Sequence, residues 1–145
     1  MKNAISLGAI VMLLSLPLPA LAGATHVTLY KNPHCSCCEE YAAYLRKNGF
    51  EVDVKETGDL QGITLKAGVS EQLEGCHTMF VEGYVVVGHV SAEIMSKLLK
   101  ERPPIVGIAI PGMPSGVPGM TGRKTGLVTV YEVSKDKVPT VYAVE

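Results

Sequence analysis

The chain has 145 residues, of which 47% are hydrophobic and 19% are charged, and its formal net charge at pH 7 is -1. This length is enough for one domain with a hydrophobic core of its own. Neither end of the chain carries a cluster of basic residues, so the charge pattern argues against nucleic acid and anionic membrane surfaces as partners.

Residues 1–22 have the features of a secretory signal peptide. Lys2 supplies a short positive region, residues 4–16 form an apolar run, and residues 20–22 read Ala-Leu-Ala, a typical cleavage site. The apolar run is shorter than the roughly 20 residues that a membrane-spanning helix needs. We therefore expect an exported, soluble protein that consists of a domain over residues 23–145 and does not insert into the membrane after signal cleavage.

The mature chain begins with a pattern typical of a strand, a helix and a second strand. Residues 26–30 predict a buried strand, residues 38–48 carry apolar side chains at helical spacing, and residues 50–55 alternate as a second strand. A helical connection of this length makes the two strands parallel. The loop between the first strand and the helix therefore lies at the carboxyl end of that strand, where ligands commonly bind.

The following segments complete the order of a thioredoxin-like fold. They are one or two short helices within residues 58–75, a hairpin over residues 78–81 and 84–88, a helix that begins near Ser91, a strand over residues 105–110, a Pro/Gly-rich loop over residues 111–120, and strands over residues 127–133 and 139–144. We therefore predict an α/β protein with a mixed sheet, flanking helices and a C-terminal extension of loop and strands.

Three of the four cysteines occupy the loop before the first helix. Cys35 and Cys38 have the CxxC spacing of thiol redox sites, where a helix N-terminus lowers the pKa of a thiol. Cys37 is a third thiol for which a redox pair has no use. The predicted topology places Cys76, in the loop before the third strand, opposite this motif. Together the four cysteines form a set of soft ligands that indicates a metal.

The spacing favours some roles of these cysteines over others. A Cys35-Cys38 bridge closes a very short loop, so as a structural disulfide it would stabilise the fold little. Structural zinc normally uses two separated pairs of ligands, and the chain has one such pair. Dense thiolates select Cu(I) and suit bridging between metal ions. The chemistry of Cys35, Cys37, Cys38 and Cys76 is thus consistent with a multinuclear Cu(I) site, ahead of zinc and of an iron-sulfur cluster.

Additional ligands are available near these thiols. His34 and His77 each adjoin a cysteine, and either one is a candidate metal ligand or an ordinary loop residue, with His89 as a further candidate. Met113 and Met120 stand in two similar Pro-Gly-Met units of the irregular loop. Thioethers are soft ligands for Cu(I), but methionines also serve as packing beneath a loop.

Several motifs resemble those of the CopG-type periplasmic copper-resistance proteins. They are Tyr30-Lys31-Asn32-Pro33 before the cysteine motif, Gly75-Cys76-His77-Thr78, Gly83-Tyr84, Gly88-His89-Val90, Glu101-Arg102-Pro103 and the Pro-Gly-Met loop. The resemblance covers nearly all of the mature chain. It implies a thioredoxin-like fold, a periplasmic location and a multinuclear copper cluster on the four cysteines, with other periplasmic copper-handling proteins as potential partners. Ser36, where the family pattern has glycine, and Met79, where a smaller residue is usual, depart from the pattern without removing a thiol.

Two functions remain open from the sequence. The first is a periplasmic protein of copper resistance that binds Cu(I) and either sequesters it, passes it on or changes its redox state. The second is a thiol-disulfide oxidoreductase that uses Cys35 and Cys38. The second function leaves Cys37, Cys76 and the Pro-Gly-Met units unexplained, so we expect the first.

Overall fold

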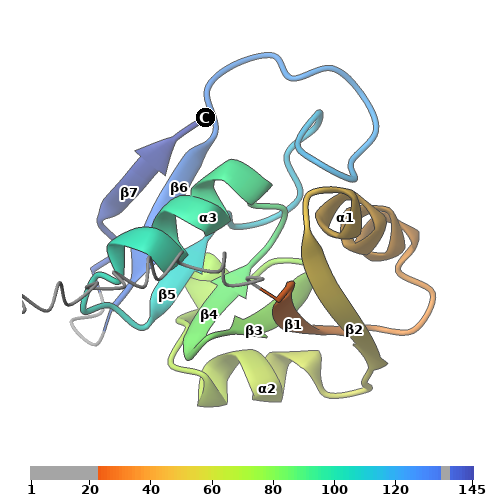
Figure 1. The fold of residues 1–145 in the computed structure, drawn as a ribbon, viewed down its shortest axis with the longest axis horizontal. Coiled ribbons are helices and arrows are strands. Elements are labelled where there is room, and N and C mark those ends of the chain that lie inside the picture. The colour runs from red at the N-terminus through yellow and green to blue at the C-terminus, as the bar shows by residue number, and fades with distance from the viewer. Residues whose placement is uncertain (1–22, 135–137) are drawn as a thin grey trace, which may run out of the picture.

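The computed structural model describes residues 23–134 and 138–145, and the predicted signal peptide at residues 1–22 lies outside this part of the chain. A seven-stranded sheet in the order β2-β1-β3-β4-β5-β6-β7 forms the centre of the molecule, with helices packed on its faces (Figure 1). The elements are β1 (Thr25–Lys31), α1 (Ser36–Lys47), β2 (Phe50–Glu56), α2 (Leu60–Lys66), the short 3-10 helix η1 (Glu71–Leu73), β3 (His77–Val81), β4 (Tyr84–Val87), α3 (Ala92–Glu101), β5 (Gly107–Ala109), β6 (Thr129–Val133) and β7 (Val141–Val144). No helix in residues 23–134 or 138–145 is long and apolar enough to cross a membrane.

The first four strands have the arrangement of a thioredoxin-like fold, as predicted. β1 pairs in parallel with β2 and antiparallel with β3, and β3 pairs antiparallel with β4. The C-terminal extension lengthens the same sheet, because β5 pairs in parallel with β4 and is followed by antiparallel β6 and β7. The loop between β5 and β6 passes close to α1 (Figure 1). This topology brings the extension to the N-terminal end of α1.

Helix α1 begins two residues earlier than the apolar spacing predicts. Cys35 is its N-cap residue and Ser36 its first residue, so Cys37 and Cys38 both lie in the first turn. Sequence spacing missed this turn because its residues are polar or small and do not extend the apolar stripe. The helix dipole is stabilised by Glu39 in the first turn and by basic residues in the last turn.

A buried lysine ties α1 to the sheet. Lys31, the last residue of β1, is 2% exposed, and its Nζ lies 3.1 Å from carboxylate oxygens of both Glu39 on α1 and Glu56 on β2. Hydrogen bonds to Glu39 and then Glu56 raise the pKa of Lys31, so its ammonium group stays charged. These contacts hold both ends of the cysteine loop, which begins directly after Lys31 and ends in α1.

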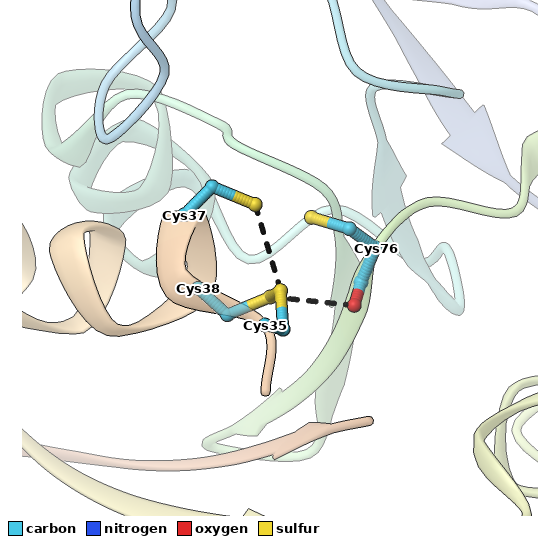
Figure 2. Close-up of side chains that lie close together, drawn as sticks. All are labelled: Cys35, Cys37, Cys38 and Cys76. Carbon is cyan, nitrogen blue, oxygen red and sulfur yellow. Dashed lines mark hydrogen bonds between the residues drawn. A yellow bond between two sulfur atoms is a disulfide. The ribbon is translucent and has the colours of Figure 1, made fainter. Parts of the chain in front are cut away.

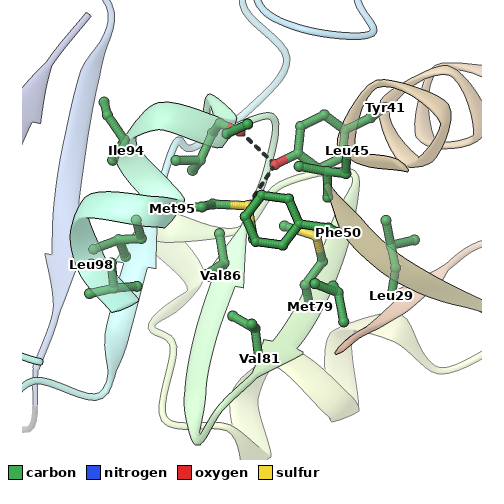
Figure 3. Packing of buried hydrophobic residues seen from close by; sticks show 14 of the residues in the cluster. Leu29, Tyr41, Leu45, Phe50, Met79, Val81, Val86, Ile94, Met95 and Leu98 are labelled. Atoms are coloured by element: carbon green, nitrogen blue, oxygen red, sulfur yellow. Dashed lines mark hydrogen bonds between the residues drawn. The ribbon is translucent and has the colours of Figure 1, made fainter. Parts of the chain in front are cut away.

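The main core lies between the sheet and helices α1 and α3 (Figure 3). Fully buried side chains of the strands, such as Leu29 and Met79, meet Leu45 of α1 and Met95 and Leu98 of α3. Met95 therefore serves as core packing, in agreement with its position in an amphipathic helix.

The hydroxyl of Tyr41 provides the first testable prediction. This side chain is fully buried on α1, and its Oη donates a 2.6 Å hydrogen bond to the carbonyl of Val90 (Figure 3). Tyr41→Phe removes the donor and leaves a buried acceptor, so we expect the free energy of unfolding to fall by about 1–3 kcal/mol. Urea denaturation followed by circular dichroism measures this change.

Tyr142→Phe is the matched control for that measurement. The Tyr142 hydroxyl donates to Glu101 at 3.3 Å in an exposed position. Loss of this surface contact should change the free energy of unfolding by less than about 0.5 kcal/mol. Equal effects of the two substitutions would contradict the role of the buried hydrogen bond.

Candidate metal centre

The first turn of α1 and the loop before β3 bring the four cysteines together (Figure 2). The sulfur atoms of Cys35, Cys37, Cys38 and Cys76 all lie within 4.8 Å of one another. The antiparallel register of β1 and β3 pairs Lys31 with His77, so the segment before β3 meets the segment after β1. This pairing explains why Cys76 reaches the motif although it is remote in sequence.

The four sulfur atoms are in two chemical states. Cys35 and Cys38 form a disulfide, whereas Cys37 and Cys76 are free thiols. The Cys37 sulfur lies 3.5 Å from the Cys35 sulfur and faces that of Cys76 (Figure 2). The Cys38 sulfur lies 3.4 Å from the carbonyl oxygen of Cys76. Reduction of the disulfide would therefore create four adjacent thiols without a change of topology.

Two buried histidines extend this cluster on the side of Cys76. The Cys76 sulfur lies 3.3 Å from Nδ1 of His77 and 2.9 Å from Nε2 of His89. On the other side of its ring, His89 Nδ1 donates a 2.6 Å hydrogen bond to the carbonyl of Pro118. This bond leaves the Nε2 lone pair directed at the sulfur, which is the arrangement that orients metal-binding histidines.

Burial controls the protonation of these groups. It is the main reason why the pKa of the Cys76 thiol rises to about 12, and the neighbouring Cys37 adds to the effect. Burial, together with the nearby His89, lowers the pKa of His77 to about 3. Burial also lowers the pKa of His89, against the opposing effect of its hydrogen bond to Pro118. In the metal-free site both imidazoles are therefore neutral near pH 7 and keep a lone pair available.

Tyr41 holds the two imidazoles in place. Its ring stacks on His77 with the centroids 4.7 Å apart, and the centroid of His89 lies at 4.9 Å. The apolar spacing over residues 38–48 predicted a helix there but no contact between Tyr41 and the histidines. This role of Tyr41, like the close approach of His89 to Cys76, depends on contacts between α1, β3 and the segment after β4, and no local sequence pattern signals such contacts.

The remaining candidate residues differ in their exposure and in whether they line the surface beside the cluster. His34 is exposed, and within residues 23–134 and 138–145 it belongs to neither group of side chains that could hold a metal ion. Its φ of 64° places it in the turn before Cys35. Met113 is 61% exposed and lines a depression of about 400 Å³ together with Cys35 and Cys76. Met120 is half-buried and does not line this depression.

The second Pro-Gly-Met unit forms a wall of the site. Pro118 accepts the hydrogen bond from His89, and Gly119, with φ at +77°, approaches the backbone of Tyr41 so closely that an added Cβ would lie 2.7 Å from its nitrogen. Only glycine fits this combination of a positive φ and close contact. The C-terminal extension is therefore packed directly against α1 and the imidazole cluster.

The donor set suits copper ions. Reduced, the site offers four thiols, which bind Cu(I) as thiolates once their protons are lost. Oxidised, it offers the thiols of Cys37 and Cys76 with the imidazoles of His77 and His89. Imidazole accommodates Cu(II) as well as Cu(I), and the second hydrogen bond of His89 is of the kind that positions a ligand. The residues present thus fit copper in either state of the disulfide.

These features define the class of protein as a thioredoxin-like protein with a cluster of cysteines and histidines that could hold a metal ion. Two solved structures named copper resistance protein CopG, form 1 and form 2, are similar to the chain. Each is 32% identical to it and superposes with a TM-score of 0.77; the alignments cover 84% and 83% of this chain and 98% of the solved chain. A family described as a protein of unknown function, DUF411, matches residues 73–120. No curated protein matches the chain.

The chain belongs to the CopG family of copper resistance proteins. The segment matched by DUF411 includes Cys76, both buried histidines and the two Pro-Gly-Met units, and so covers half of the site.

Proposed function

We propose that this protein binds Cu(I) in the periplasm as part of copper resistance, in a multinuclear cluster held by Cys35, Cys37, Cys38 and Cys76. The observation that carries the proposal is the convergence of all four sulfur atoms within 4.8 Å. Four thiolates at this spacing are able to bridge several soft cations, whereas one tetrahedral zinc site would use each of them as a terminal ligand. The copper resistance proteins to which the chain is similar support the choice of copper.

The same site supports a role in changing the redox state of copper. When the thiolates of Cys35 and Cys38 form their disulfide, two electrons are released, which suffice to reduce two Cu(II) ions to Cu(I). The imidazoles of His77 and His89 are able to accept Cu(II) before this step, and the remaining thiols retain Cu(I) after it. A new cycle would require a dithiol reductant to restore the two thiols.

A second candidate function is thiol-disulfide exchange with other proteins. It is favoured by the Cys35-Cys38 disulfide at the N-terminal end of α1 in a thioredoxin-like fold. Cys35 is partly exposed and Cys38 is fully buried, which matches an attacking and a resolving thiol. This function leaves Cys37, Cys76 and the imidazoles without a role, so we rank it second.

Copper binding should depend on the state of the disulfide. The reduced mature chain is expected to bind more than one Cu(I) per molecule, because reduction adds two thiolates to the donor set. The disulfide form should bind fewer ions through the donors that remain. The measurement is copper and zinc content after anaerobic loading of both forms, with X-ray absorption at the copper edge to identify sulfur and nitrogen ligands.

Alkylation of the reduced thiols before loading provides the control, since it should abolish the cluster in an otherwise identical chain. A single tightly bound zinc ion, with no copper taken up under reducing conditions, would contradict the proposed function. Equal copper content in the reduced and disulfide forms would show that Cys35 and Cys38 are not ligands.

A further inference from the structure

An exposed thioether stands beside the sulfur cluster. The side chain of Met113 is 61% exposed although it is large and apolar. It lines a depression of about 400 Å³ that is also lined by Cys35 and Cys76. By contrast, Cys38, His77 and His89 are completely buried. The depression therefore offers a route from solvent to the cluster, and Met113 contributes an exposed sulfur-containing side chain to its lining.

The backbone holds Met113 next to Cys76. Gly75 and Gly112 form a parallel β-bridge, and the Gly112 amide donates a 2.9 Å hydrogen bond to the carbonyl of Glu74. Each glycine is followed directly by a sulfur-containing residue. Because residues in parallel register project to the same side of their strands, the bridge aligns Cys76 with Met113. The backbone from which this exposed side chain extends is thus held beside Cys76 by the fold.

The second Pro-Gly-Met unit has the same three residues in a different environment. Its Pro118 and Gly119 contact His89 and Tyr41, and Met120 is half-buried outside the depression. Packing therefore accounts for the second unit. It does not account for Met113, which buries little apolar surface where it stands.

We propose that Met113 captures Cu(I) at the mouth of this depression and passes it to the thiolates of Cys76 and Cys35. This inference rests on the proposed copper function and adds a step to it. A thioether is soft, uncharged and never needs to lose a proton, so it binds Cu(I) at once but more weakly than a thiolate does. In the transfer the bond from copper to the Met113 sulfur breaks as a bond to a thiolate forms, the thiol proton passes to water, and copper stays Cu(I). Met113 thus acts on the rate of loading rather than on the final copper content.

Stopped-flow transfer of Cu(I) from its bicinchoninate complex to the reduced chain tests this step under anaerobic conditions. Met113→Leu keeps a side chain of similar volume and removes the sulfur, and Met120→Leu is the matched control. We expect Met113→Leu to slow the transfer about tenfold, because the rate-limiting exchange would lose one weak copper–sulfur contact. The control should remain within about twofold of the wild type, and all three chains should reach the same copper content.

The outcomes separate this inference from the function on which it rests. Equal transfer rates for Met113→Leu and the wild type would overturn the capture role while copper binding stands. A lower final copper content in Met113→Leu alone would also overturn it, because Met113 would then be a resident ligand of the cluster. Failure of the wild-type chain to take Cu(I) from the complex would overturn the proposed copper function itself. Thermal melting of the variants confirms that each is folded.

Discussion

Replacing Cys37 with serine is expected to abolish multinuclear copper binding while the Cys35-Cys38 disulfide still forms. Cys37 Sγ lies 3.5 Å from Cys35 Sγ and within 4.8 Å of the other cysteine sulfurs, so it is placed to bridge metal ions. A hydroxyl is a harder and weaker ligand for Cu(I) and is not expected to rebuild this bridge. Copper content after anaerobic loading measures the effect, and copper tolerance of cells that express the variant should fall with it.

The same substitution separates the two candidate functions. In thiol-disulfide exchange Cys35 attacks and Cys38 resolves, so Cys37→Ser should leave reduction of insulin largely unchanged. Ser36→Ala, an exposed change at the neighbouring position, serves as a control for local disturbance of α1. Strong reductase activity in the wild type and in Cys37→Ser, with unchanged copper content, would reverse our ranking and make the chain an oxidoreductase with an incidental third thiol.

Replacing Cys76 with serine is expected to lower both the number of copper ions bound and the affinity for copper. Cys76 connects the thiols of α1 with the imidazoles, since its sulfur contacts both His77 and His89. The affinity should fall by more than roughly tenfold, because even the loss of a residue that merely orients a metal ligand has an effect of this size. Competition with a Cu(I) chelator measures the affinity.

Two further observations make the test of Cys76 specific. Cys76 is partly exposed and lies outside the main core, so the melting temperature of the metal-free Cys76→Ser chain should stay close to that of the wild type. His34→Asn is the control, because His34 is exposed and asparagine tolerates its positive φ. If Cys76→Ser binds copper like the wild type, the cluster does not extend to the loop before β3.

The disulfide is common to the two candidate functions of the site. Because the loop between Cys35 and Cys38 is short, this disulfide stabilises the folded chain little. It lies among the other candidate metal ligands. Its closure removes two thiolates from the donor set but leaves Cys37, Cys76 and the imidazoles in place. Metal content and thiol redox state are therefore expected to change together, which a reductase that acts on protein disulfides alone would not require.

The sequence alone was sufficient for the properties that depend on local patterns. Apolar periodicity located the helices and strands, because the face that a side chain occupies repeats with the period of its element. The order of these elements, together with the CxxC motif before a helix, led to the thioredoxin-like topology and to the expectation that Cys76 lies opposite the motif. The start of α1 at Ser36, two residues before the predicted one, falls on a turn without apolar side chains, and β5, β6 and β7 each begin two residues later than predicted.

Tertiary structure decided how the candidate ligands are arranged. His34 and His77 are equivalent in the sequence, since each adjoins a cysteine, but one is an exposed turn residue and the other is buried against Cys76 and Tyr41. The two Pro-Gly-Met units likewise separate into an exposed thioether and a wall of the site. These differences arise from the register of β1 with β3 and from the path of the extension across α1. Both are set by the packing of the whole chain, which no short stretch of sequence encodes.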